Sequence, residues 1–260
     1  MMVQIFATFF TFTFFIFCDS EFVENLPKCH LDDFDCQRDL YETVIRDIGE
    51  EGIPELNIPP VDPIHLINVT VNVIDMINYT LVEGVAKGIK DCIFEKFSIN
   101  ISEEIGHQEN TCDLTIKGTY RFEASSPLLQ VLLGGNSIHG EGNGEVEIEQ
   151  LHLVFDFPFF AQRRDDGEIY IKCLYDHIKY DYEIRGKATF FADNIYMDDE
   201  EISKPMTDMM NENWRFAMSA FGQPYVDKAM ELYFEFAALF FDNVPARHFI
   251  IDDLSPYARP

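Results

Sequence analysis

Apolar and polar residues alternate along the middle of the chain, from about Leu66 to Ile195. A period of two is typical of strands that bury one face and expose the other. The alternating apolar positions form six groups: Val69/Val71/Val73, Leu114/Ile116, Val146/Ile148, Leu151/Leu153/Phe155, Ile178/Tyr180/Tyr182/Ile184 and Ala188/Phe190/Ala192. We therefore predict a series of antiparallel strands.

The alternation changes phase between Ile148 and Leu151. An extra residue in one strand of a pair bends the sheet, so this change predicts a β-bulge and a strongly curved sheet. Glycine-rich and Asp-Gly segments are typical of turns, and we predict turns at Gly134 to Gly144 and at Asp165-Asp166-Gly167.

Two segments follow the helical period instead. Between Asp33 and Ile48 apolar residues recur at steps of three and four, which predicts a short amphipathic helix. The same steps run from Met206 to Phe240 and predict one long C-terminal helix. Pro224 lacks a backbone N–H, so we expect a kink or a brief break there.

Prolines dominate the segment that follows the first predicted helix. Four of them, at positions 54, 59, 60 and 63, lie between Ile53 and Pro63. Proline has a fixed φ and disfavours helical backbone in the residue before it. We therefore predict an extended, non-helical strap that leads into the sheet.

The chain begins with an apolar run without charged residues, Val3 to Cys18, which ends at the polar Asp19-Ser20-Glu21. A membrane-spanning helix needs about 20 apolar residues, and this run is shorter. We predict a signal peptide over residues 1–18, with cleavage as late as residue 20. Residues 19–260 then form a single domain, which we expect to be secreted.

Cysteines and glycosylation sequons fit an oxidising compartment. Three N-x-[ST] sequons begin at Asn68, Asn78 and Asn100 and predict N-glycosylation. Five cysteines remain after the leader, and at least one of them is outside an intramolecular pair. Cys29 and Cys36 are close in sequence, on either side of the acidic start of a predicted helix at Asp32-Asp33, so we expect them to form a disulfide. The states of Cys92, Cys112 and Cys173 stay open.

Composition narrows the classes of function. The 260 residues include 46 Asp and Glu against 19 Lys and Arg, a formal net charge of -27. Such a surface repels nucleic acids and anionic membranes. The chain also contains 25 Phe beside one Trp. So many apolar rings must line either a large core or an apolar cavity.

Sequence motifs for catalysis, phosphate binding or metal binding are weak in this chain. The segment Gly135-Asn136-Ser137-Ile138-His139 resembles an esterase G-x-S-x-G elbow but lacks the second glycine. The later glycines Gly140, Gly142 and Gly144 lead into a strand, which does not form a phosphate loop. The seven histidines never come closer than thirteen positions, so no local metal motif is present and we predict no metal or cofactor.

Several segments together resemble the juvenile hormone-binding protein and takeout-like family. The match spans nearly the whole mature chain, with its parts in the family's order. The segments are Cys29-x6-Cys36, Gly52-Ile53-Pro54, Ile58-Pro59-Pro60-Val61-Asp62-Pro63, Lys117-Gly118-Thr119-Tyr120, Asp166-Gly167-Glu168-Ile169-Tyr170, Asn211-Glu212-Asn213-Trp214-Arg215 and Val244-Pro245. The resemblance implies an α+β fold, in which a long curved antiparallel sheet wraps around a long C-terminal helix.

The resemblance also implies a function: a secreted carrier that holds a small hydrophobic ligand such as juvenile hormone, another terpenoid or a fatty-acid-like molecule. On the apolar stripe of the C-terminal helix and the inward strand positions, we predict the ligand-binding residues Met210, Trp214, Phe221, Tyr225, Phe155 and Phe190. Two alternatives remain: a secreted acidic protein that acts through a protein partner or receptor, and a lipid esterase.

Overall fold

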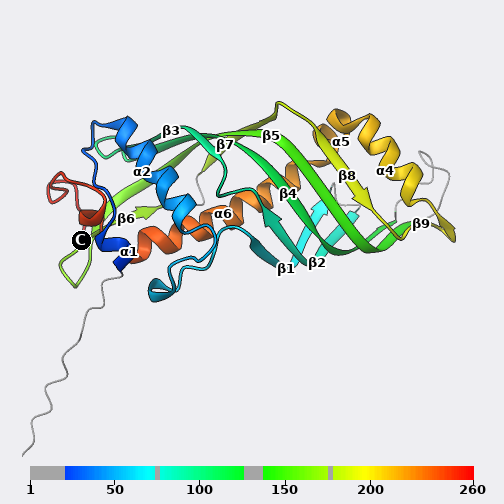
Figure 1. Ribbon diagram of the computed structural model, residues 1–260, viewed down its shortest axis with the longest axis horizontal. Helices are drawn as coiled ribbons and strands as arrows, with labels where there is room; N and C mark the ends of the chain where they lie inside the picture. The colour runs from blue at the N-terminus through cyan, green and yellow to red at the C-terminus, as the bar shows by residue number, and fades with distance from the viewer. Residues whose placement is uncertain (1–20, 74–76, 126–136, 175–177) are drawn as a thin grey trace, which may run out of the picture.

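A computed structural model describes residues 21–73, 77–125, 137–174 and 178–260 of the chain. One strongly curved antiparallel sheet dominates it (Figure 1). Its strands are β1 (Ile64–Val73), β2 (Ile77–Lys87), β3 (Ile93–Asn100), β4 (Ile105–Ser125), β5 (Ser137–Arg163), β6 (Ile169–Cys173), β7 (Lys179–Ile184), β8 (Ala188–Ala192), β9 (Ile195–Met197) and β10 (Glu200–Glu201). The predicted α+β architecture is confirmed.

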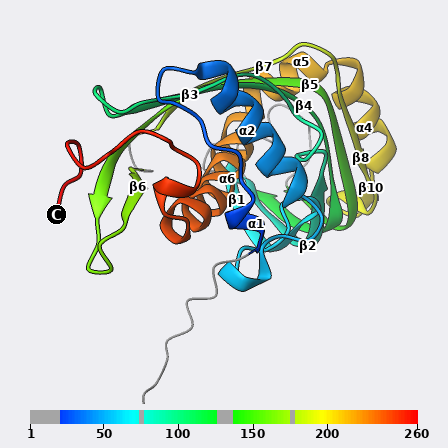
Figure 2. The ribbon, with the colours of Figure 1, turned by 60° about the vertical axis from the view of Figure 1, so that its left-hand side comes forward.

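The long strands β4 and β5 pair with each other and form the spine of the sheet. The edge of β4 away from β5 pairs with β2 and β3. The other edge of β5 pairs in turn with β9, β8, β7 and β6. Because β5 exchanges one short partner for the next along its length, the sheet curves into an open roll (Figure 2).

The predicted bulge between Ile148 and Leu151 is confirmed. Leu114 pairs with Ile148 and Cys112 pairs with Leu151, so two residues of β5 lie opposite the single Asp113. The carboxylate of Asp113 accepts a hydrogen bond from the backbone N–H of Gln150 at 2.7 Å. At this point β5 changes partner from β8 to β7, which places the bend of the sheet here.

The predicted turn at Gly134 to Gly144 is wrong over its described part, because residues 137–144 belong to β5. The glycines make room for neighbouring groups. A Cβ on Gly140 would come within 2.7 Å of the Phe122 ring, and a Cβ on Gly142 within 2.1 Å of the Asp193 carboxylate. Residues 134–136 lie outside the described part. The Asp165-Asp166-Gly167 turn is confirmed, with Gly167 at φ 86°.

The predicted N-terminal amphipathic helix is α2 (Phe34–Asp47), preceded by the short α1 (Glu21–Glu24). The Asp33 side chain caps α2 by accepting a hydrogen bond from the backbone N–H of Cys36 at 3.0 Å. The apolar face of α2 packs on β3 and leaves the opposite face in solvent. In Figure 2, α2 lies across the open side of the roll.

The C-terminal segment forms three helices, and this corrects the prediction of one helix from Met206 to Phe240. They are α4 (Ser203–Glu212), α5 (Trp214–Phe221) and α6 (Gln223–Asn243). The break near Pro224 falls at Gly222, because proline is tolerated in the first turn of a helix and so begins α6. A second break, at Asn213, was not predicted. There α4 ends docked on β8, where the Asn211 amide bonds the backbone of Phe190.

The proline-rich strap also differs from its prediction. It contains a short 3-10 turn, η1 (Pro54–Leu56), closed by hydrogen bonds between the backbones of Ile53 and Ile58. Pro54 occupies the first turn of η1, where no backbone donor is needed. Near the end of the strap lies the buried Asp62, whose carboxylate accepts hydrogen bonds from the backbone N–H groups of Gly88 and Lys90.

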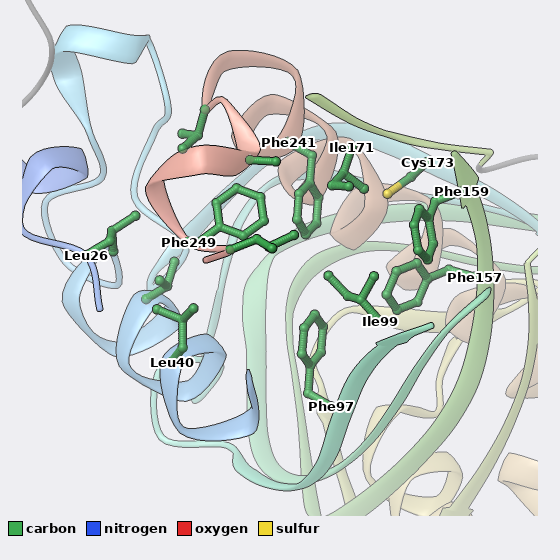
Figure 3. Close-up of a cluster of buried hydrophobic side chains, with 14 of the residues drawn as sticks. Leu26, Leu40, Phe97, Ile99, Phe157, Phe159, Ile171, Cys173, Phe241 and Phe249 are labelled. Carbon is green, nitrogen blue, oxygen red and sulfur yellow. The ribbon is translucent and has the colours of Figure 1, made fainter. Parts of the chain in front are cut away.

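The largest core lies between α6, α2 and the inner face of β5. Figure 3 shows Phe157 and Phe159 of β5 facing Phe241 of α6 across this interior, with Phe97 and Leu40 below. The 3-10 turn η3 (Ala246–His248) and Phe249 close the same end. α6 therefore runs along the concave side of the sheet, as the fold class predicted (Figure 1).

Candidate functional site

An apolar cavity of about 70 Å³ lies between α2, β3 and the second half of α6. Among the described residues, no charged side chain lines it. Its walls are Cys29, Leu31, Gln37, Leu40, Tyr41, Val44, Ile45, Ile48, Val61, Ile64, Ile89, Phe97, Ile99, Tyr233, Phe236, Ala237, Phe240, Phe241, Phe249 and Ile250. Ligand pockets usually exceed about 300 Å³, so a ligand of terpenoid size requires these flexible side chains to move apart.

The wall on α2 follows directly from the helical period. Leu40, Val44 and Ile48 recur every four residues and therefore share the face that points inward. The wall on α6 repeats this arrangement with Tyr233, Phe236 and Phe240. The helical period in the sequence therefore accounts for each of the two cavity walls. The curved sheet brings the wall on α2 and the wall on α6 together.

Three polar side chains reach the cavity: Gln37, Tyr41 and Tyr233. The Tyr41 and Tyr233 hydroxyl groups contact each other across the gap between α2 and α6. The Tyr41 ring stacks on Phe97 with ring centroids 4.0 Å apart. Burial raises the pKa of Tyr233 to about 12, so its hydroxyl stays protonated at neutral pH.

Behind Tyr233 lies a short chain of buried amides on β4. The Gln108 amide places Nε2 at 3.0 Å and Oε1 at 3.1 Å from the Tyr233 hydroxyl oxygen. Gln108 Nε2 also donates to Asn110 Oδ1 at 2.8 Å. Sequence reasoning missed this cluster, because residues 107–111 are all polar and show no alternation that would mark the inward face.

The described residues contain two disulfides near the cavity. Cys29 and Cys36, expected to pair, have sulfurs 1.96 Å apart and join the N-terminal segment to α2. Cys92 and Cys112 form the second bond and pack against Ile45 and Tyr41 of α2. Cys173 is buried in the main core and belongs to neither disulfide.

The six predicted ligand-binding residues lie outside the lining of this cavity. Phe155 adjoins it, because its ring centroid lies 5.9 Å from that of Tyr233. The remaining five belong to the other end of the molecule, on α4, α5, β8 and the start of α6: Met210, Trp214, Phe221, Tyr225 and Phe190.

At that other end the side chains differ in burial. Trp214 is buried, Met210 and Phe190 are partly buried, and Phe221 is 36% exposed. Tyr225 meets the ring of Tyr79 edge to face at 5.5 Å. Burial raises the pKa values of both tyrosines. Tyr79 also stacks on Tyr120, so Tyr225 adjoins a second group of aromatic rings. The role of the five residues in ligand binding stays a prediction.

The three sequon asparagines are all exposed. Asn68 lies in β1, Asn78 lies near the start of β2, and Asn100 ends β3. Their side chains are therefore accessible to glycosylation, which stays a prediction.

The described part of the chain gives little support for a metal site or an esterase site. No group of three metal-ligating side chains occurs among the residues that the structure places. Ser137, the serine of the esterase-like segment, lies within β5 instead of on a strand-to-helix elbow. No helix of the described segments is long and apolar enough to cross a membrane.

Comparisons with known proteins agree with this architecture. The crystal structure of Takeout 1 from Epiphyas postvittana superposes with a TM-score of 0.74, covering 86% of this chain and 99% of that one at 20% identity. No curated protein matches the sequence. The family model for haemolymph juvenile hormone binding protein matches residues 6–251, nearly the full length. The chain therefore belongs to the haemolymph juvenile hormone binding protein family.

Proposed function

We propose that the protein is a secreted carrier that binds a small hydrophobic ligand, a terpenoid or a molecule with a fatty chain, in the cavity between α2 and α6. The observation that carries the proposal is a cavity with apolar walls that is closed on opposite sides by two amphipathic helices. Family membership supports a hydrophobic-ligand carrier.

The physical chemistry of the cavity suits a carrier. Burying about 300 Å² of apolar ligand surface contributes roughly 7 kcal/mol at 25 cal/mol per Å², before the cost of association. The phenylalanine side chains of the wall adapt by rotation and carry no hydrogen-bonding group that could be left unsatisfied. The net charge of -27 keeps the exterior soluble. Binding of this kind requires no catalytic group.

Filling the cavity tests the proposal. Ala237 lines the cavity from α6, and tryptophan at this position would occupy the space that the ligand needs. We expect Ala237→Trp to weaken binding of a fluorescent apolar probe, N-phenyl-1-naphthylamine, at least tenfold. Ala229→Trp serves as the matched control, because Ala229 is exposed on the same helix. Circular dichroism and thermal unfolding verify that both variants fold.

Equal probe affinity in wild type and in folded Ala237→Trp would refute this cavity as the binding site. A measurable change in Trp214 emission on binding would then favour a site at the other end of the molecule, where Trp214 is buried in α5.

The esterase alternative predicts turnover of juvenile hormone or short-chain esters that Ser137→Ala abolishes, and we expect no turnover.

The other alternative is a secreted acidic protein that acts through a protein partner. Such a protein would bind its partner equally well with the cavity filled by Ala237→Trp.

A further inference from the structure

One long edge strand of the sheet contains no acidic residue, lysine or arginine. β1 stands at the end of the strand order, and among the described residues it pairs with β2 alone. The backbone N–H and C=O groups on the free side of such a strand can pair with a strand of another molecule. No Asp, Glu, Lys or Arg occurs from Pro63 to Ile74, although 25% of the residues of the chain are charged.

The two faces of β1 differ in what covers them. The inner face packs on α6 through a cluster that contains Leu66. The outer face is exposed, and Ile67 on it is 69% exposed. A long, uncharged edge strand with an exposed isoleucine is the kind of surface at which the sheets of separate molecules join.

The other described strands at the margins of the sheet are protected in ways that β1 is not. β10 consists of two exposed glutamates. β6 and β8 have five residues each. β3 and β7 carry exposed charged side chains, namely Glu95, Lys96, Lys179, Asp181 and Glu183. Short strands and charged side chains are common means by which a sheet edge resists pairing, and the ten-residue β1 has neither.

Two of the three glycosylation sequons lie at this edge. Asn68 belongs to β1 itself, and Asn78 belongs to β2 in register with Asn72 of β1. The side chains of both sequon asparagines are exposed. The third, Asn100, ends β3, which pairs with a different part of β4 from β2. The sequons therefore concentrate on the margin of the sheet that lacks charge.

We propose that N-linked glycans on Asn68 and Asn78 cover the open edge of β1 and prevent it from pairing with β1 of a second copy of this chain. Two copies related by a twofold axis place their β1 strands antiparallel, so a single edge is complementary to itself. The proposal goes beyond the proposed function, because it concerns the outer edge of the sheet and not the cavity.

The modification itself is an ordinary transfer of an oligosaccharide from a lipid diphosphate donor. The asparagine Nδ2 forms a bond to C1 of the first sugar, the bond from C1 to the diphosphate breaks, and the amide gives up one proton as the lipid diphosphate leaves. The product is bulky and soluble, and it adds no backbone strand to which an edge could pair.

The negative charge of the protein does not replace this protection. The net charge is -27, but at an ionic strength of about 0.15 M charges more than about 8 Å apart are largely screened. Like charges directly at an edge oppose pairing at short range, and β1 supplies none.

Removing both glycans tests the proposal. Asn68 has φ 52°, which glycine adopts without strain, so the variant combines Asn68→Gly with Asn78→Gln. Wild type and variant are secreted from the same eukaryotic culture and compared by light scattering after size exclusion. We expect wild type to be monomeric and to carry a glycan on Asn68 by peptide mass spectrometry. The mass of the variant should rise about twofold or more with concentration, as a twofold dimer requires.

Two further variants locate the contact. Asn100→Gln removes the third glycan, away from β1, and should stay monomeric as wild type does. Ile67→Lys added to the glycan-free variant places like charges on both edges and should restore the monomer. In the associated form, hydrogen exchange of the backbone amides of residues 64–73 should be slower than in the monomer. Circular dichroism verifies the fold of each variant.

Three results would each overturn the proposal: a wild-type protein without a glycan on Asn68, a folded glycan-free variant that stays monomeric, or association that Ile67→Lys leaves unchanged. Enzymatic trimming of the glycans on the folded wild type gives the same comparison without a substitution, should the variant fail to fold. Binding of N-phenyl-1-naphthylamine to the wild-type monomer is measured separately. Its absence counts against the proposed function and leaves the edge proposal intact.

Discussion

Tyrosines supply much of the polar chemistry of the interior. Burial raises the pKa values of Tyr79, Tyr170 and Tyr233 to about 12, and those of Tyr120 and Tyr225 upward as well. An unfolded tyrosine has a pKa of about 10. The folded state therefore retains these protons over a pH range in which the unfolded state loses them.

The free energy of unfolding should consequently fall as the pH rises above about 10. Below pH 10 both states are protonated and the tyrosines make no pH-dependent contribution; between about 10 and 12 the unfolded state binds fewer protons, which favours unfolding. Absorbance at 295 nm should show a group of tyrosines that ionise only together with the loss of near-UV circular dichroism. Independent ionisation of all eleven tyrosines near pH 10, with the fold intact, would contradict this.

Single residues of the site were only partly predictable. Tyr41 and Tyr233 lie on apolar stripes that the helical period reveals, but their contact joins residues 192 positions apart. No local pattern encodes that separation. The prediction placed the ligand along residues 210–225 because one continuous helix from Met206 to Phe240 would keep all its apolar residues on a single face. The breaks at Asn213 and Gly222 divide that stripe between two ends of the molecule.

The helix α2 is the element on which the site depends most, because it forms one wall of the cavity. Asp33 caps its first turn and the Cys29–Cys36 disulfide joins that turn to the N-terminal segment. Replacing an N-cap Asp by Ala usually costs about 0.5–2 kcal/mol of stability. The cavity should therefore be sensitive to changes at this end of the helix.

Asp33→Ala should lower the free energy of unfolding in urea by about 1 kcal/mol. It should also weaken binding of the apolar probe, because a frayed α2 no longer closes the cavity. Asp32→Ala is the control. Asp32 is an exposed aspartate directly before the cap residue Asp33, so its loss removes the same charge and leaves the cap in place. Equal stability of the two variants would show that the cap does not hold the wall.

Elements with an uninterrupted period were predicted well, and those with interruptions were not. α2 and the alternating part of β5 follow their periods closely. β3 was missed because its register shifts between Phe94 and Lys96, and β2 because its register shifts after Leu81. A shift moves the next side chain to the other face, so the alternation disappears from the sequence although the strand continues.

At the scale of the whole molecule, the curved sheet and α6 enclose the apolar residues while the acidic ones cover the exterior. Many of the described Phe side chains lie in this interior: several pack in the core between β5 and α6, and others line the cavity. A chain of this composition needs such an enclosed interior to stay soluble. The same enclosure gives an apolar ligand a place away from water.

Native mass spectrometry tests this account most directly. The secreted protein is purified from culture medium, delipidated, exposed to a lipid extract and freed of excess lipid. We predict that one small apolar molecule stays bound per protein, and that Ala237→Trp retains none while Ala229→Trp retains one. A folded wild-type protein that emerges without any bound molecule, or an Ala237→Trp variant that binds as the wild type does, would contradict the carrier with its ligand between α2 and α6.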